Sequence, residues 1–428
     1  MERRPESGRA RRTVWFRTSL RNTVLDVLEA QRGWEETQSE FDWDLHWADV
    51  GWVREHLDAF TPLQDHQRIN HFQNHYELTR KDLLVKNLKR TKKQLQRSGD
   101  AAARREAEGY DFWTPTFVLP HDYGLFLEEF KRGAGGQRWI MKPIGKAQGR
   151  GIFLFEKLSD INDWKRDANW QKEASAGLPA KTADTYIVQK YVERPYLVGG
   201  KKFDLRLYAL VTSFAPLTFW IYRAGFARFS NSRYSSGKRD MDNLFMHLTN
   251  AAVQKTAEDY DEQLGCKWVL HALKMFLISK HGVQRVDALF LAIQQLITRS
   301  LLAVQPVIIQ DRHCFELYGY DVLIDADLKP WLLEVNASPS LTADTDADYA
   351  LKAKLIQDTL DILDLDNRRS SKNVKGTRTE THIGGFDLIW SDGLPVPNAH
   401  PAGYSAYLGC AFPGMADHAT LARGGTNS

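Results

Sequence analysis

The sequence predicts a mixed α/β (α+β) fold in which two sheet-containing units face each other and a smaller domain precedes them. Three observations lead to this prediction. Strand-like runs flank a glycine-rich turn within residues 139–155, a strand-like run of alternating apolar and charged residues opens at 200–211, and a strand hairpin is predicted within 318–336. Apolar residues at helical spacing predict two helices before the hairpin, over 266–279 and 286–304.

Length and composition set the broad class. A chain of 428 residues is long enough for two or three domains, and 43% hydrophobic with 26% charged residues is ordinary for a globular protein. The three cysteines (Cys266, Cys314 and Cys410) are widely spaced, which excludes a disulfide framework and a zinc knuckle and favours a reducing compartment. No apolar run reaches the ~18 residues of a membrane helix, so no membrane partner is predicted. The arginine-rich N-terminus lacks the apolar core of a secretory signal, and a basic tail is favoured over a mitochondrial presequence.

The N-terminal domain is predicted to span residues 1–110 and to end in a basic helix. Between Lys81 and Arg105, nine lysines or arginines stand against two acids, and leucines at helical spacing predict an amphipathic helix with a basic outer face. This face is either an ordinary solvated surface or a binding surface for an acidic polymer. The chain lacks RNA-binding, zinc-finger and helix-turn-helix patterns, so an acidic protein is favoured over nucleic acid as the partner.

The second unit, 111–199, is predicted to carry a phosphate-binding turn. Its glycine-rich segment 145–151 lets backbone amides approach an anion, and Lys146 and Arg150 add positive charge. Lys142 ends the preceding strand and is placed to reach the phosphates. The pattern is not the Walker motif, and an ordinary hairpin turn is the alternative. A further strand is predicted at 186–192.

The third unit, 200–367, opens with a strand whose two faces differ. Successive strand residues point to opposite sides, so Lys202, Asp204 and Arg206 share one face and the apolar residues between them share the other. This pattern suits the wall of a nucleotide cleft, with the cations on phosphates and Asp204 on a ribose hydroxyl. A surface ladder of salt bridges is the alternative. The segment His247-Leu-Thr-Asn250 adds short polar groups at the mouth of this cleft, although His247 is equally well explained as a core histidine.

The hairpin predicted within residues 318–336 carries a candidate metal site. Each strand is an apolar run interrupted by a carboxylate, Asp321 in the first and Glu334 in the second. Glu334 and Asn336 are two residues apart and point the same way, and Asp321 joins them if the strands pair. Two carboxylates and an amide are hard oxygen ligands, the type that holds magnesium on nucleotide phosphates. A hairpin whose acids face water is the alternative.

Other segments predict no chemistry of their own. His71 and His75 are spaced for one helix face but lack a third metal ligand, and Cys314 lacks an evident base, so packing roles are predicted for all three. Residues 368–428 hold nine of the 29 glycines and four of the 15 prolines, which predicts a mostly disordered tail. Within it, the segment 386–390 is predicted to be a linker, with a short docking segment as the alternative.

Taken in order along the chain, these segments resemble the tubulin–tyrosine ligase-like family, whose members are ATP-grasp amino-acid ligases acting on tubulin. The similarity spans about residues 40–365 and is strongest for the polyglutamylase branch. The motifs that carry it are Lys142 before the glycine-rich turn, Gln189-Lys-Tyr-Val192, Lys202-Phe-Asp-Leu-Arg206, His247-Leu-Thr-Asn250 and the highly specific Glu334-Val-Asn-Ala-Ser-Pro-Ser340. The resemblance implies an ATP-grasp fold that holds the nucleotide between the units 111–199 and 200–367.

The resemblance also implies roles for individual residues. Arg150 departs mildly from the family pattern, which more often has Lys there, and keeps the positive charge. Lys142, Arg206 and Glu334 would be catalytic, and two magnesium ions would be bound by Asp321, Glu334 and Asn336, with Glu334 shared between them. Free L-glutamate would be received by Arg228, Lys267 and Lys352. ATP would be bound by Lys142, Gln148, Gly149, Gln189, Lys190, Tyr191, Val192, Lys202, Asp204, Thr249 and Asn250.

The activity implied is ATP- and magnesium-dependent ligation of free glutamate to glutamate side chains in the acidic C-terminal tails of tubulin, through an acyl phosphate. Three cations suit a donor with two carboxylates, which favours glutamate over glycine. The alternatives are a glycylase, a ligase for another acidic protein, and a non-catalytic microtubule-binding subunit of a glutamylase complex. By resemblance, the chain is expected in the cytoplasm and cytoskeleton, at the cilium, basal body and axoneme, with accessory subunits as further partners.

Overall fold

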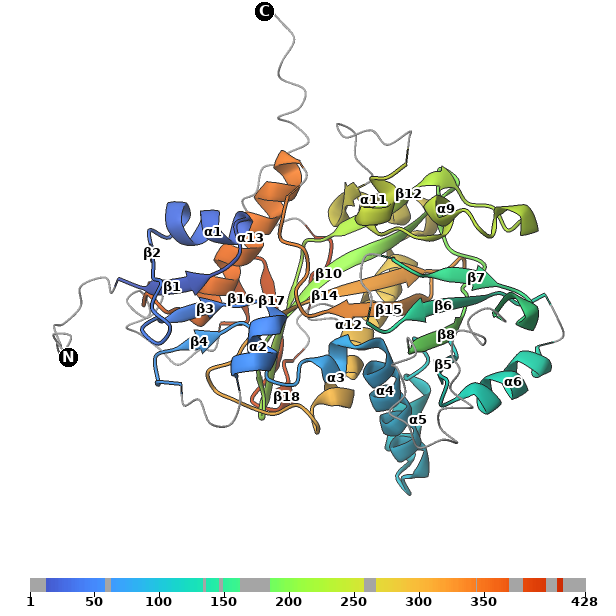
Figure 1. Cartoon of the computed structure of the whole chain (residues 1–428), viewed down its shortest axis with the longest axis horizontal. Helices are drawn as coiled ribbons and strands as arrows, with labels where there is room; N and C mark the ends of the chain where they lie inside the picture. The colour runs from blue at the N-terminus through green and yellow to red at the C-terminus, as the bar shows by residue number, and fades with distance from the viewer. Residues whose placement is uncertain are drawn as a thin grey trace, which may run out of the picture.

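The computed structural model describes residues 13–57, 63–133, 136–145, 149–161, 185–257, 267–343, 345–368, 380–397 and 406–410. These residues form a fold built on three sheets (Figure 1), which confirms the predicted mixed α/β class, while the ATP-grasp arrangement remains a prediction. The predicted domain boundaries at 110, 199 and 367 remain predictions.

The largest sheet forms the centre of the molecule. Its long strand β10 pairs with β9, β11, β12 and β14, and β14 pairs in turn with β15. The strands of this sheet are β9 (Leu197–Val198), β10 (Lys201–Phe214), β11 (Leu217–Tyr222), β12 (Phe226–Arg233), β13 (Lys267–Val269), β14 (Glu316–Ile324), β15 (Pro330–Asn336), β16 (His382–Ile383), β17 (Phe386–Ser391) and β18 (Leu394–Pro395).

Two four-stranded sheets lie on either side of the large one in Figure 1. The antiparallel sheet has the order β5-β8-β6-β7, and the parallel N-terminal sheet has the order β2-β1-β3-β4. Their strands are β1 (Trp15–Thr18), β2 (Glu35–Glu36), β3 (Leu45–Trp47), β4 (Arg68–Ile69), β5 (Thr116–Leu119), β6 (Trp139–Pro143), β7 (Phe153–Phe155) and β8 (Tyr186–Lys190).

Helices pack against all three sheets, with α6 on the antiparallel one. They are α1 (Thr23–Asp26), α2 (Val50–His56), α3 (Tyr76–Thr79), α4 (Lys81–Arg97), α5 (Ala101–Glu108), α6 (Tyr123–Arg132), α9 (Leu244–His247), α10 (Ala251–Gln254), α11 (Leu270–His281), α12 (Val283–Val304) and α13 (Asp346–Leu363), together with a π-helix at Val27–Gln31 and 3₁₀ turns at Leu158–Ile161 and Lys238–Asp240.

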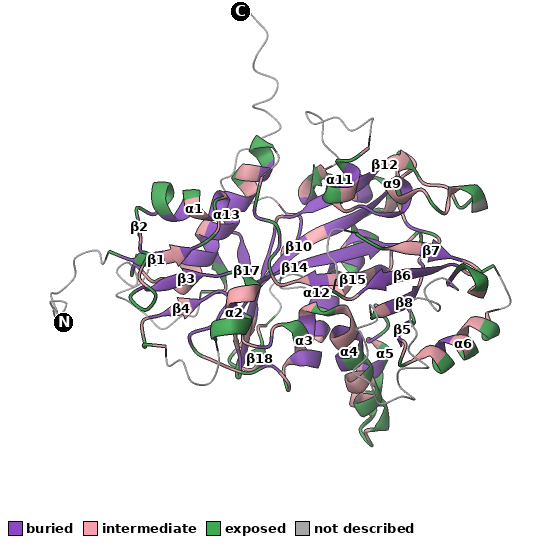
Figure 2. Ribbon diagram, viewed as in Figure 1, coloured by how far each residue is buried: buried purple, intermediate pink, exposed green. Residues whose placement is uncertain are grey.

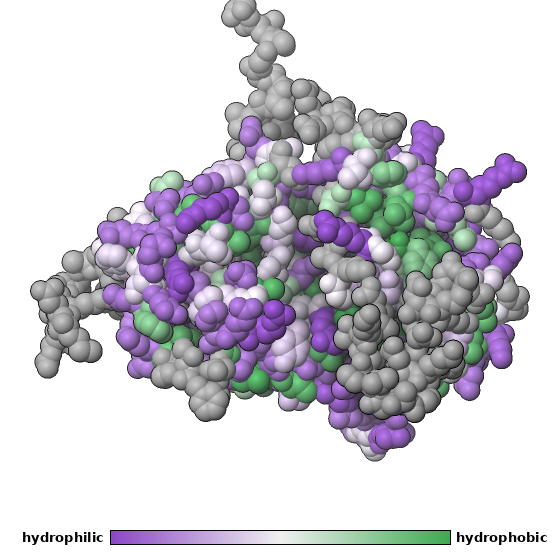
Figure 3. Space-filling model, in the orientation of Figure 1, coloured by the Kyte–Doolittle hydropathy of each residue, from purple (hydrophilic) through white to green (hydrophobic). Residues whose placement is uncertain are grey.

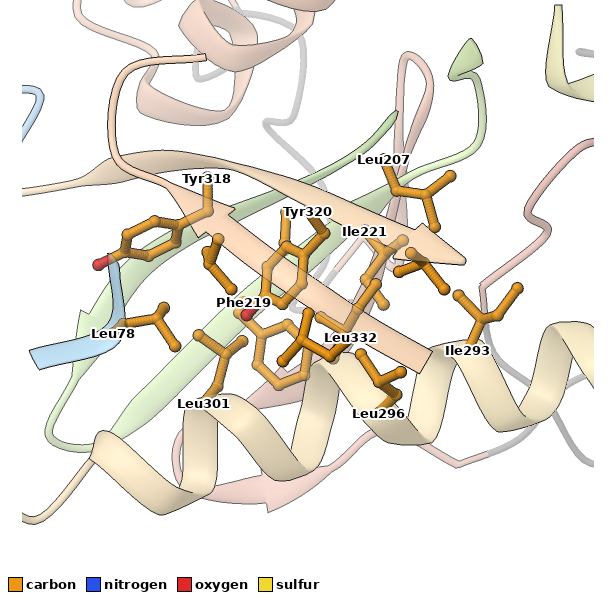
Figure 4. Packing of buried hydrophobic residues seen from close by; sticks show 14 of the residues in the cluster. Leu78, Leu207, Phe219, Ile221, Ile293, Leu296, Leu301, Tyr318, Tyr320 and Leu332 are labelled. Carbon is orange, nitrogen blue, oxygen red and sulfur yellow. The ribbon is translucent and has the colours of Figure 1, made fainter. Parts of the chain in front are cut away.

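The large sheet buries a different hydrophobic cluster on each face (Figure 2). On one face, alternate residues of β10 such as Phe203, Leu205 and Leu207 pack with residues of α12, as Figure 4 shows for Leu207 and its neighbours. On the other face, Tyr208 and Leu210 pack with residues of α13 and of the N-terminal sheet. The polar residues of β10 are thereby left to line a cavity at one end of the strand.

Helix α12 differs from the expectation that no segment resembles a membrane helix. It is long and apolar enough to span a bilayer by length and composition. Its residues Leu289, Ile293, Leu296 and Ile297 are nevertheless buried in the core beside the large sheet. This packing accounts for its apolar sequence, because the core helix of a folded protein needs the same composition.

Two segments have more structure than the sequence predicted. Residues 101–108 form a separate helix, α5, beyond the single basic helix that the sequence predicted, because the Asp100 carboxylate caps the backbone N–H groups of Ala102 and Ala103. The described part of the tail is also folded, contrary to the predicted disorder. Strand β17 pairs with β11 and buries Phe386 and Leu388 completely or nearly so.

Candidate active site

A cavity of about 750 Å³ lies between the antiparallel sheet and the large sheet. Strands β6 and β8 provide one wall, and β10, β12, β14 and β15 provide the other. Nine lysines or arginines line it against three carboxylates. Its size lies within the ~300–1,000 Å³ of small-molecule sites, and the excess of positive charge suits a strongly anionic ligand.

The structure brings the predicted site residues together in this cavity. Gln148 lies outside the described residues, and every other predicted residue lines the cavity walls. They are Lys142, Gly149, Gln189, Lys190, Tyr191, Val192, Lys202, Asp204, Arg206, Arg228, Thr249, Asn250, Lys267, Asp321, Glu334, Asn336 and Lys352. Their individual roles remain predictions.

Two buried lysines face the cavity from opposite sheets. Lys142 of β6 donates to Gln189 Oε1 at 2.8 Å, and Lys202 of β10 donates to the backbone oxygen of His247 at 2.7 Å. Burial lowers the pKa of Lys142 to about 8 and that of Lys202 to about 7. An approaching polyanion would favour the charged form of both amines, because its negative charge attracts the ammonium groups.

A chain of hydrogen bonds holds Lys202. Its ammonium donates to the Tyr191 hydroxyl at 3.1 Å, and that hydroxyl lies 3.0 Å from His247 Nδ1. His247 Nε2 lies 2.9 Å from the carbonyl oxygen of Asp240, which can only accept. The histidine therefore carries its proton on Nε2 and accepts from Tyr191 through Nδ1. The sequence did not decide between a cleft residue and a core residue for His247. In the structure it is buried, and it holds Tyr191 and Lys202 in place through hydrogen bonds.

Acids and arginines pair across the floor of the cavity. Asp321 accepts from Arg206 Nε at 2.6 Å and lies 2.8 Å from an Arg228 nitrogen, while Asp204 accepts from Arg228 Nε at 2.8 Å. Burial alone would raise the pKa of Asp321, but the two arginines hold it well below its usual range. Asp321 is therefore ionised at neutral pH and available as an anionic ligand.

The predicted hairpin is present and places the candidate metal ligands on facing strands. Asp321 of β14 stands opposite Glu334 of β15, and the register shifts immediately beyond this pair. Asn336 Nδ2 donates to the backbone oxygen of Gly319 at 3.3 Å. Glu334 Oε2 lies 3.2 Å from Lys81 Nζ, at the start of α4.

The side-chain oxygens of Asp321, Glu334 and Asn336 are the candidate ligands for magnesium. Among the described residues, no group of three or more His, Cys, Asp or Glu side chains could hold a metal. Two carboxylates with the amide oxygen of Asn336 do provide three hard oxygen ligands on one face of the hairpin, the type that magnesium prefers when phosphates and water complete its shell. The residues therefore fit this ion.

The three cations predicted to receive an amino acid lie close together. Arg228 of β12 stands opposite Lys267 of β13, and Lys267 and Lys352 donate to the same oxygen of Asp348 at 2.8 and 3.0 Å. Each cation therefore already has a protein carboxylate beside it. A free amino acid would share these cations with Asp204, Asp321 and Asp348.

Sequence reasoning missed Lys81 and Asp348. Lys81 was assigned to the outer face of the basic helix, but its ammonium turns into the cavity. Asp348 lies in the first turn of α13, where an acid is explained by the helix dipole alone. Neither position carries a sequence signal for the site, because each reaches its partner only through the tertiary fold.

The basic helix is less exposed to partners than its composition indicated. Lys89, Arg90 and Lys92 donate to the backbone oxygens of Thr116, Ala303 and Tyr110 and so fasten α4 to the core. Lys93 and Arg97 are exposed. The edge of the molecule where α4 and α5 lie is hydrophilic in Figure 3.

Residues 60–372 match the model of the tubulin-tyrosine ligase family. The chain is 49% identical to a Bos taurus protein named probable tubulin polyglutamylase TTLL9, over 90% of this chain and 85% of the relative. It is 46% identical to a Caenorhabditis elegans protein named probable tubulin polyglutamylase ttll-9, over 90% and 87% of the two chains. It is 42% identical to a Tetrahymena thermophila protein named probable alpha-tubulin polyglutamylase Ttll1, over 90% and 94%.

Proposed function

The chain belongs to the tubulin-tyrosine ligase family, and from this premise we propose that it is a tubulin polyglutamylase. The family predicted from the sequence motifs is thereby confirmed, and the relatives carry polyglutamylase names. The reaction proposed is the ATP-dependent ligation of free L-glutamate to the side-chain carboxylate of glutamates in tubulin C-terminal tails. The single observation that carries it is the pairing of Asp321 with Glu334 at one wall of a large cationic cavity.

The ligands proposed for the cavity are ATP and two magnesium ions, held between the two sheets as in an ATP-grasp fold. Lys142 and Lys202 face the cavity from opposite sheets and suit the phosphates. Asp321, Glu334 and Asn336 would hold the ions. Bound magnesium would neutralise the charge that develops on the γ-phosphoryl group as it is transferred.

The protein's own residues would position the acceptor and the donor. A carboxylate is a poor acylating agent, so the acceptor glutamate is first phosphorylated by ATP, which releases ADP. Arg206 and the buried lysines stabilise the transferring phosphoryl group. The α-amino group of the donor glutamate then attacks the acyl carbon after losing a proton, the C–O bond to phosphate breaks, and an isopeptide bond forms with release of inorganic phosphate.

Glutamate is favoured as the donor by the cluster of Arg228, Lys267 and Lys352. A free glutamate carries two carboxylates, and a pair of lysines on Asp348 beside an arginine offers separate cations for each. Glycine needs only one. A tubulin glycylase is therefore the second candidate for this site.

A non-catalytic microtubule-binding subunit is the remaining alternative. The exposed basic residues of α4, including Lys93 and Arg97, would suit binding to acidic tails without any reaction. The complete set of acids and cations around the cavity favours the enzyme. Tubulin, free glutamate and accessory subunits of a glutamylase complex are the partners proposed, with the cytoskeleton and cilium as the location.

The test is incorporation of labelled amino acid into purified tubulin by the isolated chain, with ATP and magnesium. We expect labelled glutamate to be incorporated and labelled glycine not to be. Glu334→Ala, verified as folded by circular dichroism, should abolish the reaction. Full glutamate incorporation by Glu334→Ala would refute the assignment of the site, and incorporation of glycine alone would identify a glycylase.

A further inference from the structure

A buried polar cluster lies behind the loop that follows the candidate metal ligands. Glu316, at the start of β14, and His71 are 0% and 1% exposed. Glu316 Oε1 lies 2.9 Å from His71 Nδ1, and Oε2 accepts from the Phe72 backbone N–H at 3.1 Å and from the Tyr318 hydroxyl at 3.0 Å. A buried carboxylate is costly unless hydrogen bonds satisfy it, and these three donors do so.

The hydrogen-bond partners of the His71 ring determine which of its nitrogens carries the proton. Asn70 accepts from the Ala48 N–H through Oδ1 at 2.7 Å, and its amide nitrogen donates to the Ala48 carbonyl oxygen at 3.1 Å and lies 3.2 Å from His71 Nε2. The amide nitrogen can only donate. The proton of the ring is therefore on Nδ1, and Nε2 is an acceptor.

The same Nε2 atom reaches the loop of the candidate site. Ser338 Oγ lies 3.3 Å from it, and Ser338 is two residues beyond Asn336. The loop also lies directly on β14: a side chain at Gly319 would place its Cβ only 2.8 Å from Pro339. The segment that lies on β14 is therefore held at two points. Asn336 is hydrogen-bonded to the Gly319 oxygen, and Ser338 is hydrogen-bonded to His71.

The order Glu316–His71–Ser338 has the hydrogen-bond sequence of a nucleophilic triad, but its environment argues for another role. The single lone pair of Nε2 is shared between the Asn70 amide at 3.2 Å and the Ser338 hydroxyl at 3.3 Å, so the ring is a weak base toward Ser338. The ring is almost completely buried, and besides Asn70 and the ring of His75 it contacts Glu316 of β14 and Ser338 of the loop. These contacts suit orientation rather than covalent catalysis.

We propose that His71, backed by Glu316, is a positioning residue that holds the loop 337–340 and thereby directs the Asn336 amide toward the metal site. The inference rests on the proposed function, because it assumes that Asn336 is a metal ligand. His71 acts through Ser338 and touches neither nucleotide nor metal. Loss of its hydrogen bond to Ser338 should weaken metal binding without unfolding the protein.

Two variants remove the same hydrogen bond from opposite ends. Ser338→Ala changes an exposed residue and leaves the buried cluster intact. In His71→Asn, the side-chain amide nitrogen of the new asparagine is bonded to Cγ, as Nδ1 of the histidine is, so it can still donate to Glu316. The asparagine has no atom in the position of Nε2, so the hydrogen bond to Ser338 is lost. Ser340→Ala is the matched control, because Ser340 is also exposed and its side chain forms no hydrogen bond with the described residues.

The readout is Mn²⁺ bound to the full chain with a non-hydrolysable ATP analogue, measured by electron paramagnetic resonance without tubulin. A hydrogen bond whose acceptor lone pair is shared lies at the lower end of the ordinary net strength, which predicts a Kd about twofold higher in Ser338→Ala and in His71→Asn, with Ser340→Ala unchanged. Adding Ser338→Ala to His71→Asn should not raise the Kd further, because the hydrogen bond between residues 71 and 338 is already lost in His71→Asn.

The outcomes separate this inference from the proposed function. Wild-type affinity in both Ser338→Ala and His71→Asn, or fully additive effects in the double variant, would overturn the inference alone. A wild-type chain that binds no Mn²⁺ with the nucleotide analogue would overturn the proposed metal site and the inference together.

Discussion

Replacing Asp321 and Glu334 separately should distinguish a carboxylate that is built into the fold from one that serves only the reaction. Both acids are proposed metal ligands, and they stand opposite each other on β14 and β15. Their surroundings differ. The side chain of Asp321 is 3% exposed and is shared by Arg206 and Arg228, whereas that of Glu334 is 23% exposed and, among the described residues, pairs with Lys81.

The expected losses in the free energy of unfolding follow from how deeply each carboxylate is buried. Asp321→Asn keeps the shape of the side chain but removes the carboxylate that pairs with both Arg206 and Arg228, and only Arg228 also pairs with Asp204 among the described residues. Removing one partner of a buried ion pair costs about 3–5 kcal/mol, and the lower end applies because Arg228 keeps Asp204. Glu334→Gln breaks a partly exposed pair and should cost no more than about 1 kcal/mol.

Two assays are needed on each variant: unfolding in denaturant, followed by circular dichroism, and incorporation of labelled glutamate into tubulin. We expect both variants to lose incorporation and Asp321→Asn alone to lose substantial stability. Equal free energies of unfolding for the two variants would refute the electrostatic reasoning. Retained incorporation in either variant would refute its role as a metal ligand.

Three further predictions address other parts of the molecule. Because Lys202 and Lys142 have pKa values lowered to about 7 and about 8, both lose charge as the pH rises, so the Kd for ATP measured by calorimetry should increase between pH 7 and 9; a constant Kd would contradict this. Phe386→Ala should lower the free energy of unfolding by about 3–5 kcal/mol in a denaturant titration, because this residue of the predicted tail is fully buried; an unchanged value would show that β17 does not support the fold. Charge reversal of the exposed Lys93 and Arg97 should raise the KM for tubulin at low salt with little change in kcat, and an unchanged KM would remove α4 from the tubulin-binding surface.

The parts of the site that lie on strands could be predicted from sequence because a strand fixes which way its residues point. Alternation along β10 placed Asp204 and Arg206 on one face, and the two interrupted apolar runs placed Asp321 opposite Glu334. Both predictions need only local geometry. The register that joins β14 to β15 follows from a short hairpin.

The features that could not be predicted depend on contacts between distant segments. Lys81 reaches Glu334 from a helix that local charge alone assigns to the surface. The strand β17 lies in a glycine-rich stretch, and its burial depends on pairing with β11, more than 150 residues earlier. His71 was set aside as a packing residue because Glu316 and Ser338, its partners, are far away in the chain.

The proposed ligase chemistry is tested most directly by following oxygen from the acceptor. Tubulin-tail peptide labelled with ¹⁸O in its glutamate side chains would be incubated with the chain, ATP, magnesium and glutamate. An acyl-phosphate route predicts one ¹⁸O atom in each phosphate released per glutamate joined, and no release with Glu334→Ala. Glutamate ligation that yields unlabelled phosphate, or the absence of any ligation by a chain that binds ATP and tubulin, would contradict the account.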